Sequence, residues 1–156
     1  MPVVSLRFQF RQPFQVPAPA AYAWCTDFGP GDGALFPGDH RRSVRQVGPD
    51  TILLTDTTFP GGKPLRIHRL VRLDPDQKAW TSTHLDGPYR HSQYWYRVVP
   101  DGPRASHLEY TGLRVLTVPS TPTARGLERL RQMELRDDSG EWRERIAPAL
   151  ERDLGQ

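Results

Sequence analysis

The chain has 156 residues, 37% of them hydrophobic and 25% charged, which suits one globular domain spanning residues 1–156. No apolar run approaches the roughly 20 residues of a membrane span, and the first residues lack the basic and apolar regions of a secretory signal. The single cysteine, Cys25, excludes an intrachain disulfide, so we expect a reducing, cytoplasmic setting in which Cys25 fills space in the core.

The charge pattern is that of an ordinary solvated surface. The net charge is only +3, and the 21 basic residues are two lysines and otherwise arginines spread along the chain. The densest arginine segment, 125–136, also carries Glu128 and Glu134, as a solvated helix face does. We therefore expect no nucleic-acid partner, and the sequence leaves the oligomeric state open.

The N-terminal part of the chain predicts a strand followed by short helices. Segment 4–11 alternates apolar and polar residues with a period of two, as a strand with one dry face does. The stretch 17–26 is rich in alanine and favours a short helix with Pro19 in its first turn. Glycines end this helix, and a second short helix or turn is expected over Ala34 to Phe36.

Turn sequences rich in proline, glycine and aspartate divide the middle of the chain into further strands. We expect these strands at 43–47, 51–59, 65–73, 79–85, 89–99 and 105–118. Consecutive strands with short connections pair antiparallel, because parallel pairing needs long crossovers. The result is a meander of about six or seven strands.

The segment 121–154 changes to helical spacing. Two apolar stripes run along it, Leu127, Leu130 and Met133 and then Trp142, Ile146, Ala149 and Leu150. At 100° per residue these stripes point to different sides of a helix. We therefore predict a bend or break at 137–140, and a second kink at Pro148, which cannot donate a helix hydrogen bond.

The order of these elements resembles the START-like superfamily, also called the helix-grip or SRPBCC group. The resemblance rests on 14–24, which is similar to the family's sequence from the first strand into the first helix. It rests also on 70–75, at the end of the fourth strand, and on 98–108, in the final hairpin. The hairpin departs from the family's usual Gly-Thr-Arg at 103–106. The last helix, usually uninterrupted in the family, departs by carrying Gly140 and Pro148.

The resemblance implies an α+β helix-grip fold, in which a curved antiparallel sheet wraps around a long C-terminal helix. It also implies a cavity between sheet and helix for an apolar or aromatic ligand. We expect a carrier or sensor of a small hydrophobic molecule, such as a lipid or polyketide. A polyketide cyclase/dehydrase-type enzyme using an acid/base pair is the alternative, and an interaction module without a ligand is a third class.

Strand alternation and the family pattern nominate residues of this cavity. The family pattern turns Tyr94 and Tyr96 inward, where they would supply aromatic walls and hydroxyls. Arg69 shares the apolar face of its strand, so it needs a carboxylate partner, Asp56 or Glu109, or an anionic ligand group. Core packing of the tyrosines and a solvent-reaching Arg69 are the structural alternatives.

Three more residues complete the predicted ligand-binding set. Trp80 and His84 share one face of their strand, and Tyr110 belongs to the last strand. His84 could orient a ligand or act as an acid or base near neutral pH, although a hydrogen-bonded core histidine is the alternative. None of the five histidines has a spacing typical of zinc, so we expect no metal and no cofactor.

Overall fold

The computed structural model describes residues 1–29, 32, 35–36 and 38–155. The strands are β1 (Val3–Phe14), β2 (His40–Gly48), β3 (Thr51–Thr58), β4 (Leu65–Asp74), β5 (Ala79–His84), β6 (Gln93–Pro100) and β7 (Ser106–Thr117). The helices are α1 (Ala18–Cys25), α2 (Ala124–Glu141) and α3 (Ala147–Leu154), with 3-10 turns η2 (Pro60–Gly62) and η3 (Pro75–Gln77) and a π-helical turn η4 (Trp142–Ile146).

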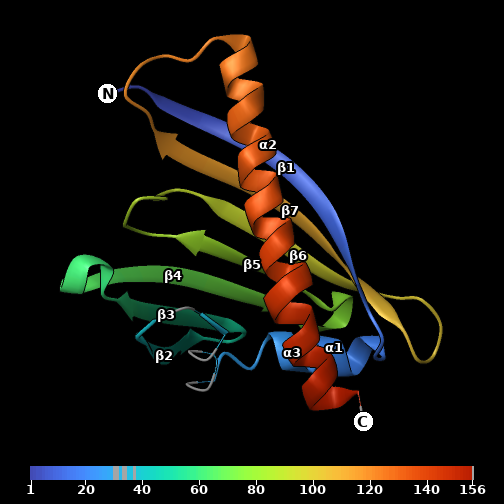
Figure 1. The fold of residues 1–156 in the computed structure, drawn as a ribbon. Coiled ribbons are helices and arrows are strands. Elements are labelled where there is room, and N and C mark those ends of the chain that lie inside the picture. Colours follow the sequence, from blue (N-terminus) through green and yellow to red (C-terminus); the bar gives the residue numbers. More distant parts are fainter. Residues whose placement is uncertain (30–31, 33–34, 37, 156) are drawn as a thin grey trace.

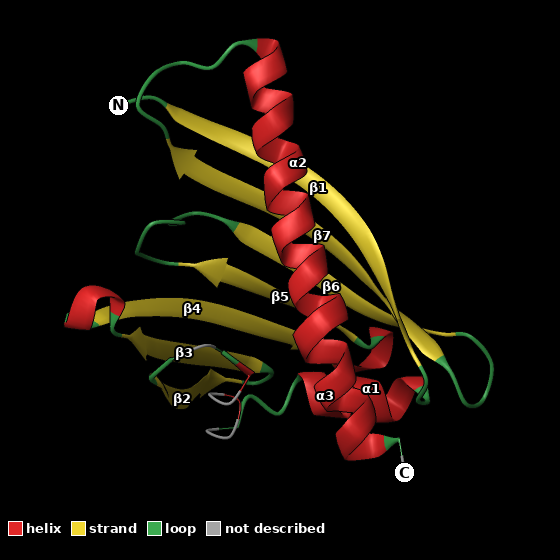
Figure 2. Cartoon of the chain, in the orientation of Figure 1, coloured by secondary structure: helices red, strands yellow, loops and turns green. Residues whose placement is uncertain are grey.

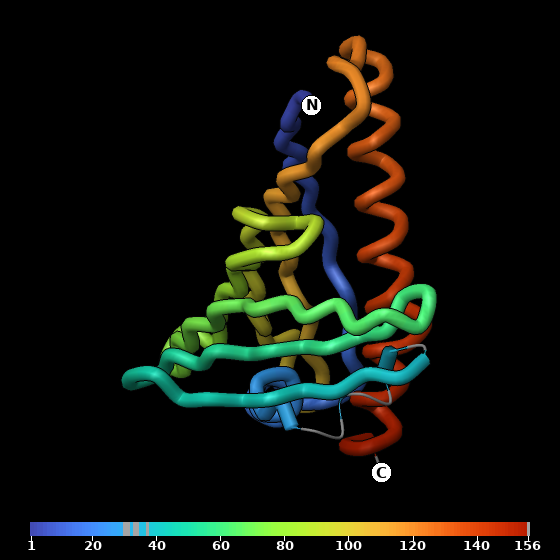
Figure 3. Tube along the Cα trace, turned by 90° about the vertical axis from the view of Figure 1, so that its left-hand side faces the viewer, coloured from blue at the N-terminus to red at the C-terminus, as the bar shows by residue number. Residues whose placement is uncertain are grey.

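The strands form one antiparallel sheet in the order β1-β7-β6-β5-β4-β3-β2. The helix formed by α2, η4 and α3 crosses the sheet, and α1 lies beside its C-terminal end (Figures 1 and 2). Turned by 90°, the helix is seen to stand on one side of the sheet only (Figure 3). These features confirm the predicted α+β helix-grip fold.

The core lies between the concave face of the sheet and the helices. Its largest fully buried side chains include Phe8 and Phe14 of β1, Leu54 of β3, Leu108 of β7 and Leu150 of α3. Each such side chain contributes about 1.5–3 kcal/mol through burial. The core therefore joins both ends of the chain, which explains how α3 is held against the first strand.

The break predicted at 137–140 of the C-terminal helix is wrong. Residues 137–140 lie inside α2, and the change of register comes later, in η4, where the Ala147 N–H donates to the Trp142 carbonyl five residues before it. One extra residue in this π-turn rotates the following apolar stripe back toward the sheet. Pro148 follows in the first turn of α3, where its missing N–H is tolerated. Met133 is 54% exposed, so it does not belong to the inward stripe.

Two other elements differ from the sequence prediction. Strand β6 begins at Gln93 rather than near Tyr89, because Tyr89 to Ser92 form a turn in which His91 has a φ of 74°. That turn places Tyr89 at the cavity. The second short helix, predicted over Ala34 to Phe36, falls partly outside the described residues.

Pro13 lies within β1, where a proline is tolerated because β1 is an edge strand of the sheet.

Candidate functional site

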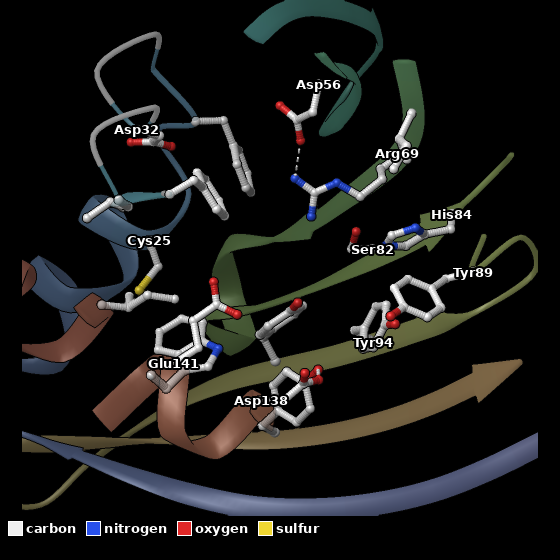
Figure 4. A pocket seen from close by; sticks show the side chains of 18 of the residues that line it. Cys25, Asp32, Asp56, Arg69, Ser82, His84, Tyr89, Tyr94, Asp138 and Glu141 are labelled. Atoms are coloured by element: carbon white, nitrogen blue, oxygen red, sulfur yellow. Dashed lines mark hydrogen bonds and ion pairs between the residues drawn. The ribbon is translucent and has the colours of Figure 1, made fainter. Parts of the chain in front are cut away.

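A cavity of about 490 Å³ lies between the concave face of the sheet and α2. All six residues predicted from the sequence line it, namely Arg69, Trp80, His84, Tyr94, Tyr96 and Tyr110. The faces predicted for β6 are confirmed, because Tyr94 is buried while Trp95 is 40% exposed. Figure 4 shows several of these side chains around the open space. Ligand binding by these six residues stays a prediction.

Aromatic rings form much of the cavity wall. Trp80 and Tyr96 stack with ring centres 4.6 Å apart and an interplanar angle of 3°. Tyr96 also contacts Tyr110 at 5.2 Å and Trp142 at 6.1 Å. Burial raises the pKa of the Tyr94, Tyr96 and Tyr110 hydroxyls, so all three are protonated at neutral pH. The wall therefore offers apolar surface together with neutral hydroxyls.

Asp56 is the centre of a first charged group, called here the Asp56 cluster. Arg69 Nη2 donates to Asp56 Oδ2 at 2.7 Å, and Arg42 Nε donates to Oδ1 at 2.7 Å. His40 Nε2 lies 3.3 Å from Oδ1, and Arg42 Nη1 also donates to Asp32 Oδ2 at 2.8 Å. Asp56 faces Arg42 directly in the β2–β3 register, which explains why the two meet.

The Asp56 cluster decides between the two predicted partners of Arg69. Asp56 is the partner, whereas Glu109 lies 3.6 Å from Arg11. Burial raises the pKa of Asp56, but hydrogen bonds and charges from Arg42 and Arg69 outweigh burial and hold the pKa below its usual value. Arg69 is therefore neutralised by the protein itself.

Arg114 is the centre of a second charged group, the Arg114 cluster, which sequence reasoning missed. Arg114 Nε donates to the Tyr94 hydroxyl at 2.9 Å, Nη2 donates to Asp138 Oδ2 at 2.8 Å, and Nη1 donates to Glu134. Tyr110 donates to the same Asp138 oxygen at 2.6 Å. The cluster thus ties β6 and β7 to α2.

A sequence signal for the Arg114 cluster did exist. Arg114 has the same parity as Leu108 and Tyr110 in β7, so strict alternation places it on the inward face. Glu134 and Asp138 are four residues apart and share one face of α2. The guanidinium also lies over the Tyr89 ring, 4.7 Å from its centre.

Three buried polar atoms of cavity-lining residues have no hydrogen-bond partner within the described chain. They are Ser82 Oγ, His84 Nδ1 and His40 Nδ1. Ser82 is 2% exposed, and Figure 4 shows its hydroxyl at the cavity. Such atoms are costly to bury unpaired, so a bound molecule is the natural partner for them.

His84 and Glu141 have perturbed protonation. Burial, followed by the charges of Arg69 and Arg114, lowers the pKa of His84 to about 4. The neutral imidazole therefore dominates at neutral pH, which suits a hydrogen bond to a ligand better than proton donation. Burial also raises the pKa of Glu141, whose carboxyl makes no hydrogen bond or ion pair among the described residues. Figure 4 shows this carboxyl pointing into the open space.

Cys25 and metal chemistry can be assessed from the same geometry. Burial raises the pKa of the Cys25 thiol, so it is protonated and unreactive, as expected of a residue that fills space. Among the described residues no group of three or more His, Cys, Asp or Glu side chains gathers as metal ligands would. In the same part of the chain, no helix is long and apolar enough to cross a membrane.

No protein-family model and no curated protein matches the sequence. Solved structures do match along nearly the whole chain. The Zhui aromatase/cyclase from Streptomyces sp. R1128 has a TM-score of 0.74 at 13% identity, covering 96% of this chain and 95% of that one. A START superfamily protein from Mycobacterium smegmatis has a TM-score of 0.73 at 10% identity, covering 94% and 97%.

A third similar structure is a point mutant of norcoclaurine synthase from Thalictrum flavum with a transition-state analogue. It has a TM-score of 0.67 at 12% identity, covering 96% of both chains. Identities this low establish the fold rather than the activity. The chain shares the helix-grip fold of these structures.

Proposed function

We propose that the chain binds a small aromatic or apolar molecule in the cavity between sheet and α2, as a carrier or sensor. The carrying observation is the buried, unpartnered Ser82 hydroxyl in a cavity of about 490 Å³ with aromatic walls. Small-molecule sites are mostly apolar, of this size, and carry a few polar groups that orient the ligand. A single cysteine, which forms no disulfide within the chain, is consistent with a cytoplasmic setting.

Glu141 supports a second candidate function, a cyclase or dehydrase-type enzyme. A carboxyl whose pKa is raised by burial keeps its proton to a higher pH than an exposed one, which is the property that a general acid needs. Two of the similar structures are enzymes by name, an aromatase/cyclase and norcoclaurine synthase. A proton-transfer role would use the same cavity and the same ligand position.

Titration with Nile red, a neutral dye that fluoresces in apolar surroundings, tests binding. We expect saturable, one-to-one binding by the native protein. Ser82→Phe places a ring where the hydroxyl faces the cavity and should reduce Nile red affinity at least about tenfold, by filling the space a ligand needs. Thr81→Phe is the matched control, because Thr81 is the neighbour on the other face of β5.

Thermal unfolding of each variant separates a blocked cavity from a lost fold. Equal Nile red binding by native protein and by folded Ser82→Phe would place the dye elsewhere and contradict the proposal. Failure of the native protein to bind the dye would also contradict it.

A further inference from the structure

The charges around the cavity are unbalanced toward negative. Six carboxylates belong to the lining residues, namely Asp32, Asp56, Glu134, Asp137, Asp138 and Glu141. Three arginines accompany them, Arg42, Arg69 and Arg114. With every carboxyl ionised, the described lining therefore carries a formal excess of three negative charges.

Every lining arginine is already neutralised by an acid. Arg42 and Arg69 hold Asp56, and Arg42 also holds Asp32. Arg114 holds Glu134 and Asp138. An acidic ligand would have to displace one of these carboxylates. Because Arg69 already pairs with Asp56, we no longer expect it to bind an anionic group of the ligand.

Two lining carboxylates form no ion pair with an arginine among the described residues, although the charge of Arg145, four residues further along the helix, acts on Glu141. The two carboxylates differ in position. Asp137 is exposed to solvent, where water satisfies it. Glu141 is partly buried and precedes Trp142, which belongs to the aromatic wall with Trp80 and Tyr96. Glu141 lines the same cavity as Trp80 and Tyr96, and Figure 4 shows its carboxyl directed into that cavity.

A carboxylate beside aromatic rings favours the binding of a cation. A cation is attracted to the faces of Trp and Tyr rings and to an unpaired carboxylate, most strongly where water is excluded. We propose that the ligand is an amine with an aromatic or apolar body, whose ammonium group lies beside Glu141 and whose body packs on Trp80 and Tyr96. The buried Ser82 hydroxyl then meets a polar group on the far part of the ligand. This inference rests on the proposed binding function.

The raised pKa of Glu141 agrees with this assignment. Burial, together with the charge of Asp138, disfavours the ionised carboxyl and outweighs the opposing charges of Arg145, Arg114 and Arg69. An ammonium group beside it would favour the ionised form again, since an opposite charge at close range stabilises it. Such a carboxyl has more to gain from a cationic ligand than an exposed one has.

Competition for bound Nile red tests the class of ligand with three matched probes on one indole frame. The probes are tryptamine, tryptophol and indole-3-propionate, which end in an ammonium, a hydroxyl and a carboxylate. At about pH 8 a primary alkylamine is protonated and both charged probes are ionised. We expect tryptamine to displace Nile red about tenfold more effectively than tryptophol, with indole-3-propionate the weakest.

Glu141→Gln assigns the preference to one side chain. The substitution keeps shape and hydrogen bonding but removes the charge, so tryptamine should fall to the level of tryptophol while tryptophol stays unchanged. Glu144→Gln is the matched control and should keep the preference, because Glu144 is an exposed carboxylate of the same helix that does not line the cavity.

Two failures can be told apart. If native protein does not bind Nile red, the proposed function itself is wrong. If it binds the dye but tryptamine and tryptophol compete equally, or if Glu141→Gln keeps the preference, the cavity binds ligands and the assignment to amines is wrong.

Discussion

The two charged clusters at the cavity have opposite compositions. In the Arg114 cluster one guanidinium serves two carboxylates, Glu134 and Asp138, together with the Tyr94 hydroxyl. In the Asp56 cluster one carboxylate is held by two guanidiniums. Removing one arginine therefore has different consequences. The first cluster loses its only cation, whereas the second keeps one.

The clusters also join different parts of the molecule. The Arg114 cluster connects β6 and β7 to α2, across the cavity. The Asp56 cluster connects neighbouring strands β2, β3 and β4 and reaches Asp32. We infer that the first cluster holds the helix on the sheet and that the second stiffens one side of the cavity within the sheet.

The largest expected effect comes from Arg114→Met. This change strands two partly buried carboxylates, so the free energy of unfolding should fall by about 3–5 kcal/mol. Arg11→Met is the control, since Arg11 pairs with Glu109 on the exposed side and should change stability by less than about 1 kcal/mol. Chemical denaturation measures both. Equal effects for the two variants would mean that the Arg114 cluster does not hold the helix.

The second-largest expected effect is a pH dependence of stability caused by His84, whose pKa is lowered by burial and by the charges of Arg69 and Arg114. Its pKa is lowered to about 4 in the folded protein, so between that pH and 6.5 the unfolded chain binds more protons. Stability from the neutral imidazole is present above pH 6.5 and is lost as the pH falls toward 4, by up to about 3 kcal/mol.

Comparison of native protein with His84→Gln isolates this pH dependence. The raised pKa values of Glu141 and Asp32 act in the opposite direction, and both proteins share that contribution. We expect the variant to lose less stability than native protein between pH 7 and pH 4. Parallel pH profiles would show that His84 titrates normally.

The smallest expected effect is that of Arg69→Met. Asp56 keeps its hydrogen bonds from Arg42, so unfolding should become easier by only about 1 kcal/mol. Comparing the loss of unfolding free energy in Arg69→Met with that in Arg114→Met tests most directly whether the two clusters differ in how many arginines they contain. A cost for Arg69→Met as large as that for Arg114→Met would show that Arg42 cannot hold Asp56 alone.

The strand residues of the cavity wall could be predicted because inward and outward side chains alternate without interruption in β4, β5, β6 and β7. Tyr94 and Tyr96 precede any irregularity in β6, and the single register shift of the described strand pairs lies between Gln46 and Gly48, away from the predicted residues. The part of the aromatic wall that the strands supply, Trp80, Tyr94, Tyr96 and Tyr110, follows from a period of two. The same reasoning applied to β7 would have found Arg114.

The remaining differences come from contacts that local patterns do not contain. Arg114 meets acids on a helix 20 or more residues away in the chain, so its own neighbours do not reveal them. The two helical stripes looked incompatible because the π-turn before Pro148 inserts one extra residue. The position of Glu141 outside the two charged clusters could not be predicted, because it depends on which acids pair with Arg69 and Arg114.

Native mass spectrometry of the protein purified from the organism that makes it tests the central claim most directly. We expect one adduct of constant mass on the native protein and on Thr81→Phe, and its loss from folded Ser82→Phe. Fragmentation of the released adduct would then show whether the ligand carries an amine. An adduct retained unchanged by Ser82→Phe, or none on the native protein, would contradict a ligand in this cavity.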